Sequence, residues 1–240
     1  MHNKFIRTAN VKRFITMMNN LQNRAEGVPG MALVYGEPGL GKTQTINWWA
    51  FKNDAILVRC NQMMTARWLL KEILDYMSEI KPYTISESFN EVIRNLILNP
   101  RVLIVDEIDY LTMESKAVEI LRDIHDRTNV PVVLVGMTSA NSRLKKFSHL
   151  YDRLSEIIKF EKFSKTDIKT IVKELSEIEM TDCAVKYIYS NLNRFRQIVK
   201  IINKSEIIAK ANGLNSIDEI LIKEALQNET ENSQTDKDSE

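Results

Sequence analysis

The stretch that most constrains this chain is Gly36-Glu37-Pro38-Gly39-Leu40-Gly41-Lys42-Thr43, which follows an apolar run from Met31 to Tyr35. Its three glycines let the backbone turn its N–H groups inward around phosphate oxygens, and the following helix adds the positive end of its dipole. The spacing therefore predicts a phosphate-binding loop between a strand and a helix. Lys42 is expected on the β- and γ-phosphates and Thr43 on Mg²⁺. A glycine-rich turn without a ligand is the alternative.

A second motif is the apolar run from Val102 to Val105, which ends in Asp106 and Glu107. The run indicates a buried parallel strand. Open α/β sheets place their ligands at the carboxyl ends of the strands, so Asp106 can hold Mg²⁺ through water while Glu107 orients and deprotonates an attacking water. This pair of acids favours a nucleotide hydrolase over a kinase. A solvated acidic turn is the alternative, but the phosphate loop and the acidic strand predict each other.

Composition places the chain among ordinary soluble globular proteins, because its 240 residues are 44% hydrophobic and 27% charged. Its two cysteines, Cys60 and Cys183, have no metal or redox spacing and suggest a reducing compartment. No segment approaches the roughly 20 apolar residues of a membrane span. We therefore expect a cytoplasmic protein without a membrane partner.

The formal net charge of +1 hides a strong segregation of charge along the chain. Residues 1–25 carry five bases and no acid, residues 183–210 carry six bases and one acid, and residues 218–240 carry eight acids and two bases. Basic faces that are merely solvated would explain the pattern. It is also typical of a nucleic-acid-binding protein with an acidic tail.

Apolar strands alternate with amphipathic helices up to residue 163, which predicts a parallel, doubly wound sheet. Strands are expected at 31–35, 55–59, 102–105, 130–136 and 154–160, and helices near 11–18, 43–52, 65–77, 87–98 and 117–124, the first capped by Thr8 or Asn10. From Ser164 onward, helical spacing predicts four helices with no strand between them, which is a small bundle. We therefore expect a nucleotide-binding domain at 1–163, a helical subdomain at 164–227 and a disordered acidic tail at 228–240.

Together these features resemble the AAA+ ATPases over residues 1 to about 227. The resemblance implies ATP and Mg²⁺ as ligands and ATP hydrolysis as the activity. It makes Arg153, just before the last strand, similar to the arginine finger that reaches a neighbouring subunit's γ-phosphate. Arg196 is similar to the second sensor arginine, which acts in cis. The planar guanidinium spans several phosphate oxygens, which lysine cannot do. An ordinary surface arginine is the alternative at each position.

The first sensor of that family falls at Met137-Thr138-Ser139, the polar end of the strand at 130–136. Met137 stands where relatives often carry a polar residue, which leaves Thr138 or Ser139 to serve. Thr138 is our candidate for the residue beside the γ-phosphate if this strand lies next to the acidic one.

Within the AAA+ ATPases, three stretches resemble the B transposition proteins of Mu-like bacteriophages. They are residues 8–14, residues 30–43 and Trp68-Leu69-Leu70. This resemblance implies an ATP-dependent protein that assembles as a homo-oligomeric helical filament on duplex target DNA. Such a protein delivers the DNA to a transposase and stimulates strand transfer.

Candidate DNA contacts are Arg67, beyond the second strand, and Lys145 and Lys146, before Arg153. No recognition-helix motif is present, so we expect binding with little sequence preference. Two alternatives stay open. One is a helicase loader or another DNA-remodelling ATPase, and the other is a nucleotide-dependent signalling switch without DNA affinity.

Overall fold

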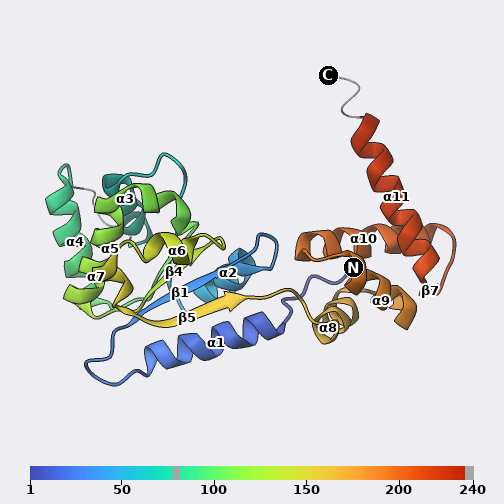
Figure 1. Ribbon diagram of the computed structural model, residues 1–240, viewed down its shortest axis with the longest axis horizontal. Helices are drawn as coiled ribbons and strands as arrows, with labels where there is room; N and C mark the ends of the chain where they lie inside the picture. The colour runs from blue at the N-terminus through green and yellow to red at the C-terminus, as the bar shows by residue number, and fades with distance from the viewer. Residues whose placement is uncertain (78–81, 236–240) are drawn as a thin grey trace. The chain divides into compact units, whose positions relative to one another are not determined.

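The computed structural model describes residues 1–77 and 82–235 (Figure 1). Within these residues, one sheet contains five parallel strands in the order β2-β3-β4-β1-β5. The strands are β1 Met31–Gly36, β2 Ile56–Arg59, β3 Leu103–Asp106, β4 Val132–Gly136 and β5 Leu154–Phe160. The predicted parallel sheet is confirmed. Because β4 pairs with β3, the polar residues after β4 lie beside the acidic end of β3.

Helices lie between consecutive strands of the chain, as the crossover connections of a parallel sheet require. They are α1 Ala9–Gln22, α2 Lys42–Lys52, α3 Ala66–Tyr76, α4 Ile85–Leu98, the 3₁₀ helix η1 Ile108–Met113, α5 Ser115–Thr128, α6 Ala140–Leu144 and α7 Ser148–Tyr151. Several begin at side-chain caps that the sequence provides. The hydroxyl of Thr8 accepts from the N–H of Val11, and Thr84 and Glu87 form a capping box on α4.

The central strands β1, β3 and β4 are buried on both faces, as expected for a parallel sheet, whereas the edge strand β5 exposes every second residue. Strand side chains alternate between the faces, and Leu33, Val105 and Leu134 point into a hydrophobic core with α3, α4, α5, η1, α6 and α7. On the other side, Phe14 of α1 meets Trp49 of α2 edge to face, with ring centroids 6.3 Å apart. Helix α1 runs alongside β5 in Figure 1. Helices packed on both sides of the sheet therefore hold its strands, and with them the loops at the carboxyl ends of the strands, in place.

A separate helical region follows the sheet. Its elements are α8 Lys165–Leu175, β6 Glu179–Met180, α9 Asp182–Asn191, α10 Phe195–Ala211, β7 Ser216–Ile217 and α11 Glu219–Thr235. Ser164 and Asp167 form a capping box that begins α8. The expectation of helices with no strand between them was wrong, because β6 pairs in parallel with β7. Two-residue strands are too short to show an alternating pattern.

Contacts divide the chain into two compact units, residues 13–160 and residues 1–12 together with 161 onward. The sequence pattern assigns the first twelve residues to the nucleotide-binding domain, whereas their contacts group them with the residues from 161 onward. Their grouping follows from long-range hydrogen bonds: the Asn10 side chain exchanges two with the backbone of Glu161, at 2.8 and 3.0 Å, and the Ala9 N–H donates to Asp167 at 2.7 Å. Such bonds leave no local signal in the sequence.

The C-terminal helix runs farther than we expected. Helix α11 continues to Thr235, past residue 228, where we placed the start of the disordered tail. Adding a residue to an existing helix costs little compared with nucleating one, so a polar sequence can extend it. Residues 236–240 of that tail lie outside the described residues. Throughout the described chain, no helix combines the length and apolar character needed to cross a membrane.

Candidate nucleotide-binding site

The loop from Gly36 to Thr43 lies between β1 and α2, as the motif predicts. Gly39 and Gly41 have φ angles of 82° and 86°, a left-handed conformation in which a side chain would be strained. Gly41 directly precedes α2. The free N–H groups of this helix start therefore face the loop, which is the arrangement that binds phosphate.

Lys42, the first residue of α2, lies inside this loop. Its side chain is buried, and its Nζ donates to the carbonyl oxygens of Gly36 at 2.8 Å and Glu37 at 2.9 Å. Burial lowers the pKa of Lys42, whereas the carboxylates of Asp106 and Asp109 raise it. A partly desolvated ammonium held among carbonyl groups is well placed to bind an anion that enters the loop.

The magnesium candidates Thr43 and Asp106 are in direct contact. The Thr43 hydroxyl donates to Asp106 Oδ2 at 2.9 Å, and the Glu107 N–H donates to Oδ1 at 2.9 Å. Burial raises the pKa of Asp106, and these two hydrogen bonds oppose the shift. No cluster of three or more His, Cys, Asp or Glu side chains that could hold a metal occurs among the described residues. Thr43 and Asp106 fit Mg²⁺ that takes its other ligands from phosphate and water.

Glu107 has an unusual backbone and an unexpected partner. Its φ and ψ of 57° and 40° are left-handed, which is uncommon for a residue with a side chain and is one form of strain found at functional sites. Arg59, the last residue of β2, donates to Glu107 Oε1 from Nη2 at 2.5 Å and Nε at 3.1 Å. Sequence reasoning missed Arg59. The sequence shows only a basic residue at the end of an expected strand. It does not show that Arg59 pairs with Asp106 in the β2–β3 register.

The loop after β4 is tied to η1, which follows the acidic strand, by Asp109, a residue that sequence reasoning also missed. The Asp109 carboxylate accepts from the N–H of Met137 and the hydroxyl of Ser139. Thr138 lies between these residues at the carboxyl edge of the sheet and is exposed. The structure thus brings Thr138, Asp106 and Glu107 to the ends of neighbouring strands.

Arg153 is not near the phosphate loop of its own chain. Its carbonyl accepts from the N–H of Met31, at the start of β1, while the loop begins at the other end of that strand. The strand separates them by roughly 15 Å, at about 3.3 Å per residue. The guanidinium instead forms a two-point ion pair with Asp126 of α5, at 3.1 and 3.2 Å.

The remaining predicted residues lie on other elements. Arg196 is exposed in the first turn of α10 in the helical unit. Arg67 of α3 donates to the Tyr83 carbonyl at 2.7 Å and lies over the Tyr83 ring. Lys145 and Lys146 follow α6 and are exposed, with Lys145 Nζ 6.0 Å from the Tyr151 ring centroid. Their roles stay predictions.

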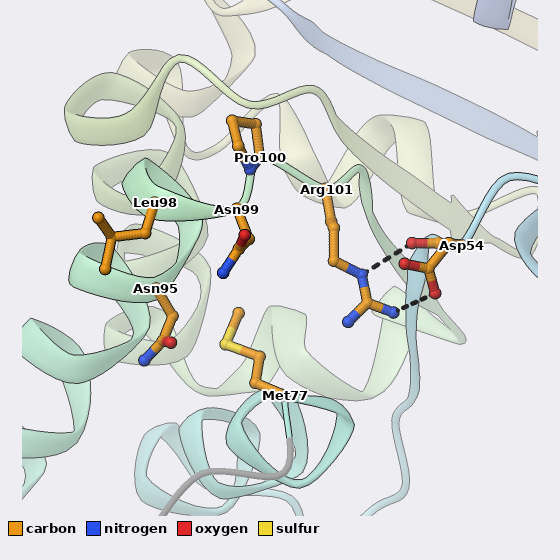
Figure 2. Close-up of a pocket in the computed structure, with 7 residues that line it drawn as sticks. All are labelled: Asp54, Met77, Asn95, Leu98, Asn99, Pro100 and Arg101. Atoms are coloured by element: carbon orange, nitrogen blue, oxygen red, sulfur yellow. Dashed lines mark hydrogen bonds and ion pairs between the residues drawn. The ribbon is translucent and has the colours of Figure 1, made fainter.

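A cavity of about 490 Å³ lies where β2 and β3 begin, at the edge of the sheet opposite the phosphate loop. Figure 2 shows the residues that line it. Arg101, which precedes β3, and Asp54, which precedes β2, line it and form an ion pair at 2.7 Å. The amino-terminal ends of parallel strands are not where open α/β sheets bind their ligands. We therefore place the nucleotide at the loop and not in this cavity.

The fold and the site together define a P-loop nucleotide-binding protein. The AAA domain family matches residues 25–144. The chain belongs to this family, and its fold is the P-loop AAA+ fold.

Known proteins support the same assignment. The chain spans 46% and 38% of the lengths of two curated relatives. The second is the Replication factor C large subunit of Thermofilum pendens, 22% identical over 180 residues, which is 72% of this chain. The Aeropyrum pernix ORC2 protein, solved in ADPNP-ADP complexes, has a TM-score of 0.72 and 14% identity, with 95% of this chain and 70% of that chain covered. The Aeropyrum pernix ORC1 protein in complex with DNA has a TM-score of 0.59 and 14% identity, covering 95% and 66%.

Proposed function

We propose that this protein is a Mg²⁺-dependent ATPase that acts on DNA. The observation that carries the proposal is the buried Lys42 ammonium inside the phosphate loop. Thr43, the next residue, is hydrogen-bonded to Asp106 at the end of the acidic strand, and Glu107 follows Asp106 directly. A phosphate cradle, a magnesium pair and a base form the set that hydrolysis of a nucleoside triphosphate needs.

In this mechanism, Lys42 binds the β- and γ-phosphates, and Thr43 and Asp106 are the residues that would hold Mg²⁺. Mg²⁺, when bound, neutralises charge that develops on the phosphates. Glu107 orients a water in line with the γ-phosphate and takes its proton. Arg59 binds one oxygen of the Glu107 carboxylate and neutralises part of its charge, so we propose that this contact restrains Glu107 as a base. Thr138 approaches the γ-phosphate from the neighbouring strand.

The protein is proposed to work as an oligomer, since Arg153 lies at the edge of the sheet opposite its own phosphate loop. At that edge it can serve as the arginine finger for a neighbouring subunit, and Arg196 can serve as the sensor in cis. A finger supplied in trans makes hydrolysis depend on assembly.

The proposed macromolecular ligand is DNA. Arg67, Lys145 and Lys146 are candidate phosphate contacts, and the ORC1 protein with the same fold was solved with DNA. By its resemblance to the Mu-like B proteins, we propose that the chain assembles as a filament on duplex DNA and delivers it to a transposase. A helicase loader or another DNA-remodelling ATPase is the second candidate. The AAA+ fold and the relative named Replication factor C large subunit support this second candidate as well as the first.

Fluorescence anisotropy with labelled duplexes of unrelated sequence, over a salt series with and without ATP and Mg²⁺, tests the proposal. We expect binding that weakens linearly with the logarithm of salt concentration and tightens with nucleotide, because assembly adds contacts subunit by subunit. Neutralising a true phosphate contact lowers the salt slope by roughly one unit on every sequence. Affinity that ignores nucleotide argues against the filament, and no binding at low salt favours the signalling switch.

Electron microscopy with duplex DNA and a slowly hydrolysed ATP analogue separates the two DNA-related candidates. Continuous helical filaments support target-DNA delivery, whereas closed rings or short oligomers support a loader. A transposase strand-transfer assay with added protein then tests stimulation directly.

A further inference from the structure

We infer that Asp109 is a positioning residue for ATP hydrolysis, and that it acts by fixing the loop of Met137, Thr138 and Ser139 beside the catalytic carboxylates. This inference rests on the proposed ATPase function. Asp109 does not need to touch the nucleotide in this role. Its carboxylate sets the place from which Thr138 meets the γ-phosphate.

The contacts of the carboxylate carry the inference. Oδ2 accepts from the N–H of Met137 at 2.6 Å, and Oδ1 accepts from the hydroxyl of Ser139 at 2.9 Å. One oxygen therefore fixes the backbone before Thr138 and the other fixes the side chain after it. Hydrogen bonds to an ionised acceptor are roughly twice as strong as neutral ones. The loop is thus held at two points by one residue of η1.

The same two bonds decide between the candidates for the first sensor. The Ser139 hydroxyl donates its hydrogen bond to Asp109. The Thr138 hydroxyl has no hydrogen-bond partner among the described residues, so it remains able to bind a ligand. Thr138 is therefore the residue that the Asp109 contacts present to the site.

Gly136 at the end of β4 shows how closely the carboxylate approaches. A Cβ on Gly136 would lie 2.6 Å from Asp109 Oδ2 and 2.6 Å from the Ala140 Cβ. Atoms this close cannot coexist without a shift, so a glycine is needed for the carboxylate to reach the Met137 N–H. The strand end is shaped to receive Asp109.

Burial lowers the pKa of Lys42, the phosphate lysine, and the Asp109 carboxylate opposes that shift. This effect offers a competing explanation. Asp109 could matter through its charge on Lys42 instead of through the loop. Asparagine separates these explanations, because its carbonyl can accept from Met137 and its amide can donate to the Ser139 oxygen, while its charge is lost.

The test compares Asp109→Ala, Asp109→Asn, Thr138→Ala and the double variant Asp109→Ala/Thr138→Ala in single-turnover ATP hydrolysis, with nucleotide affinity measured separately. For Asp109→Ala we expect hydrolysis about 10- to 100-fold slower, with an ATP Kd within about threefold of the parent, because misplacing a reacting group costs rate more than binding. Asp109→Asn is expected to stay within about threefold of the parent rate. The double variant is expected to be no slower than Thr138→Ala, since both changes remove the same function.

Two kinetic results overturn the inference. If Asp109→Asn is as slow as Asp109→Ala, the charge matters and the hydrogen bonds do not. If the effects of Asp109→Ala and Thr138→Ala multiply in the double variant, the residues act independently.

Hydrogen–deuterium exchange of the segment containing Met137, measured without nucleotide, keeps this inference distinct from the proposed function. Faster exchange in Asp109→Ala than in the parent supports the clamp, and unchanged exchange rejects it. If the parent hydrolyses no ATP while the exchange effect is present, the proposed function has failed, and the catalytic role of Asp109 fails with it.

Discussion

Arg59 and Glu107 are 48 residues apart in the chain, yet two nitrogens of the Arg59 guanidinium bind one oxygen of the Glu107 carboxylate at 2.5 and 3.1 Å. They meet because β2 and β3 are neighbours in the sheet and both residues stand at its carboxyl edge. Glu107, the side chain proposed to activate water, is therefore held by an arginine whose own side chain is mostly exposed.

Releasing Glu107 is expected to raise basal hydrolysis. Exposed ion pairs are worth about 1 kcal/mol or less, so Arg59→Ala is expected to speed ATP hydrolysis without DNA by no more than about fivefold, and to reduce the additional stimulation by DNA. Steady-state ATPase assays with and without duplex measure both effects. Arg94→Ala is the matched control, because it breaks another 2.5 Å surface pair, with Glu91, away from the site. A basal rate that stays the same or falls in Arg59→Ala would show that the contact does not restrain Glu107.

Lys42 and Glu107 are expected to have separable roles. Lys42→Ala removes the buried ammonium inside the loop, so nucleotide binding is expected to be lost. Glu107→Gln keeps the loop and the magnesium pair, so binding is retained while hydrolysis falls by about 100-fold or more. Titration with a fluorescent ATP analogue and a phosphate-release assay measure the two effects. Hydrolysis at the parent rate in Glu107→Gln means that another residue is the base.

Arg153 is expected to act between subunits. Arg153→Ala protein should bind ATP normally but hydrolyse it slowly, and a mixture with Lys42→Ala protein should recover some activity, because one subunit supplies the loop and the other the finger. Asp126→Asn is the matched variant: it removes the ion-pair partner but keeps Arg153, so activity at or above the parent level is expected. If well-mixed oligomers recover nothing, Arg153 acts in cis or only supports the structure.

His125 is expected to make stability depend on pH. Its Nε2 accepts from the Gly30 N–H at 3.0 Å and its Nδ1 donates to the Val130 carbonyl at 2.9 Å, which requires the neutral ring. Burial lowers the pKa of His125 below 6.5. The unfolded chain therefore binds the proton first, so this stability is present above pH 6.5 and is lost as the pH falls toward the folded-state pKa.

Urea unfolding between pH 5 and pH 8 checks this expectation. One proton changes the free energy of unfolding by at most about 1.4 kcal/mol per pH unit. His125→Gln is expected to be less stable than the parent at pH 8 and to show a flatter pH dependence. His149→Gln, at an exposed position, should keep the parent slope. An unchanged slope in His125→Gln would assign the acid sensitivity to other groups.

The sequence by itself determined the parts of this protein whose signals are local. The glycines and Lys42 of the phosphate loop, the apolar run before Asp106 and the Thr8 cap at the start of α1 each follow from a few consecutive residues. Turn chemistry, alternation and capping act over that same range. This is why the parallel sheet and its order of elements could be predicted before any coordinates.

Only the tertiary structure decided which of these elements became neighbours. The strand order β2-β3-β4-β1-β5 brings Arg59 to Glu107 and Asp109 to Met137 and Ser139. The pairing of Arg153 with Asp126, and that of Asn10 with Glu161, likewise join residues with no local relation. A side chain's partner depends on packing summed over the whole core, whereas its tendency to form a strand or cap depends on its immediate neighbours. The motifs of this site are therefore encoded locally, and the contacts that position them arise only from the folded sheet.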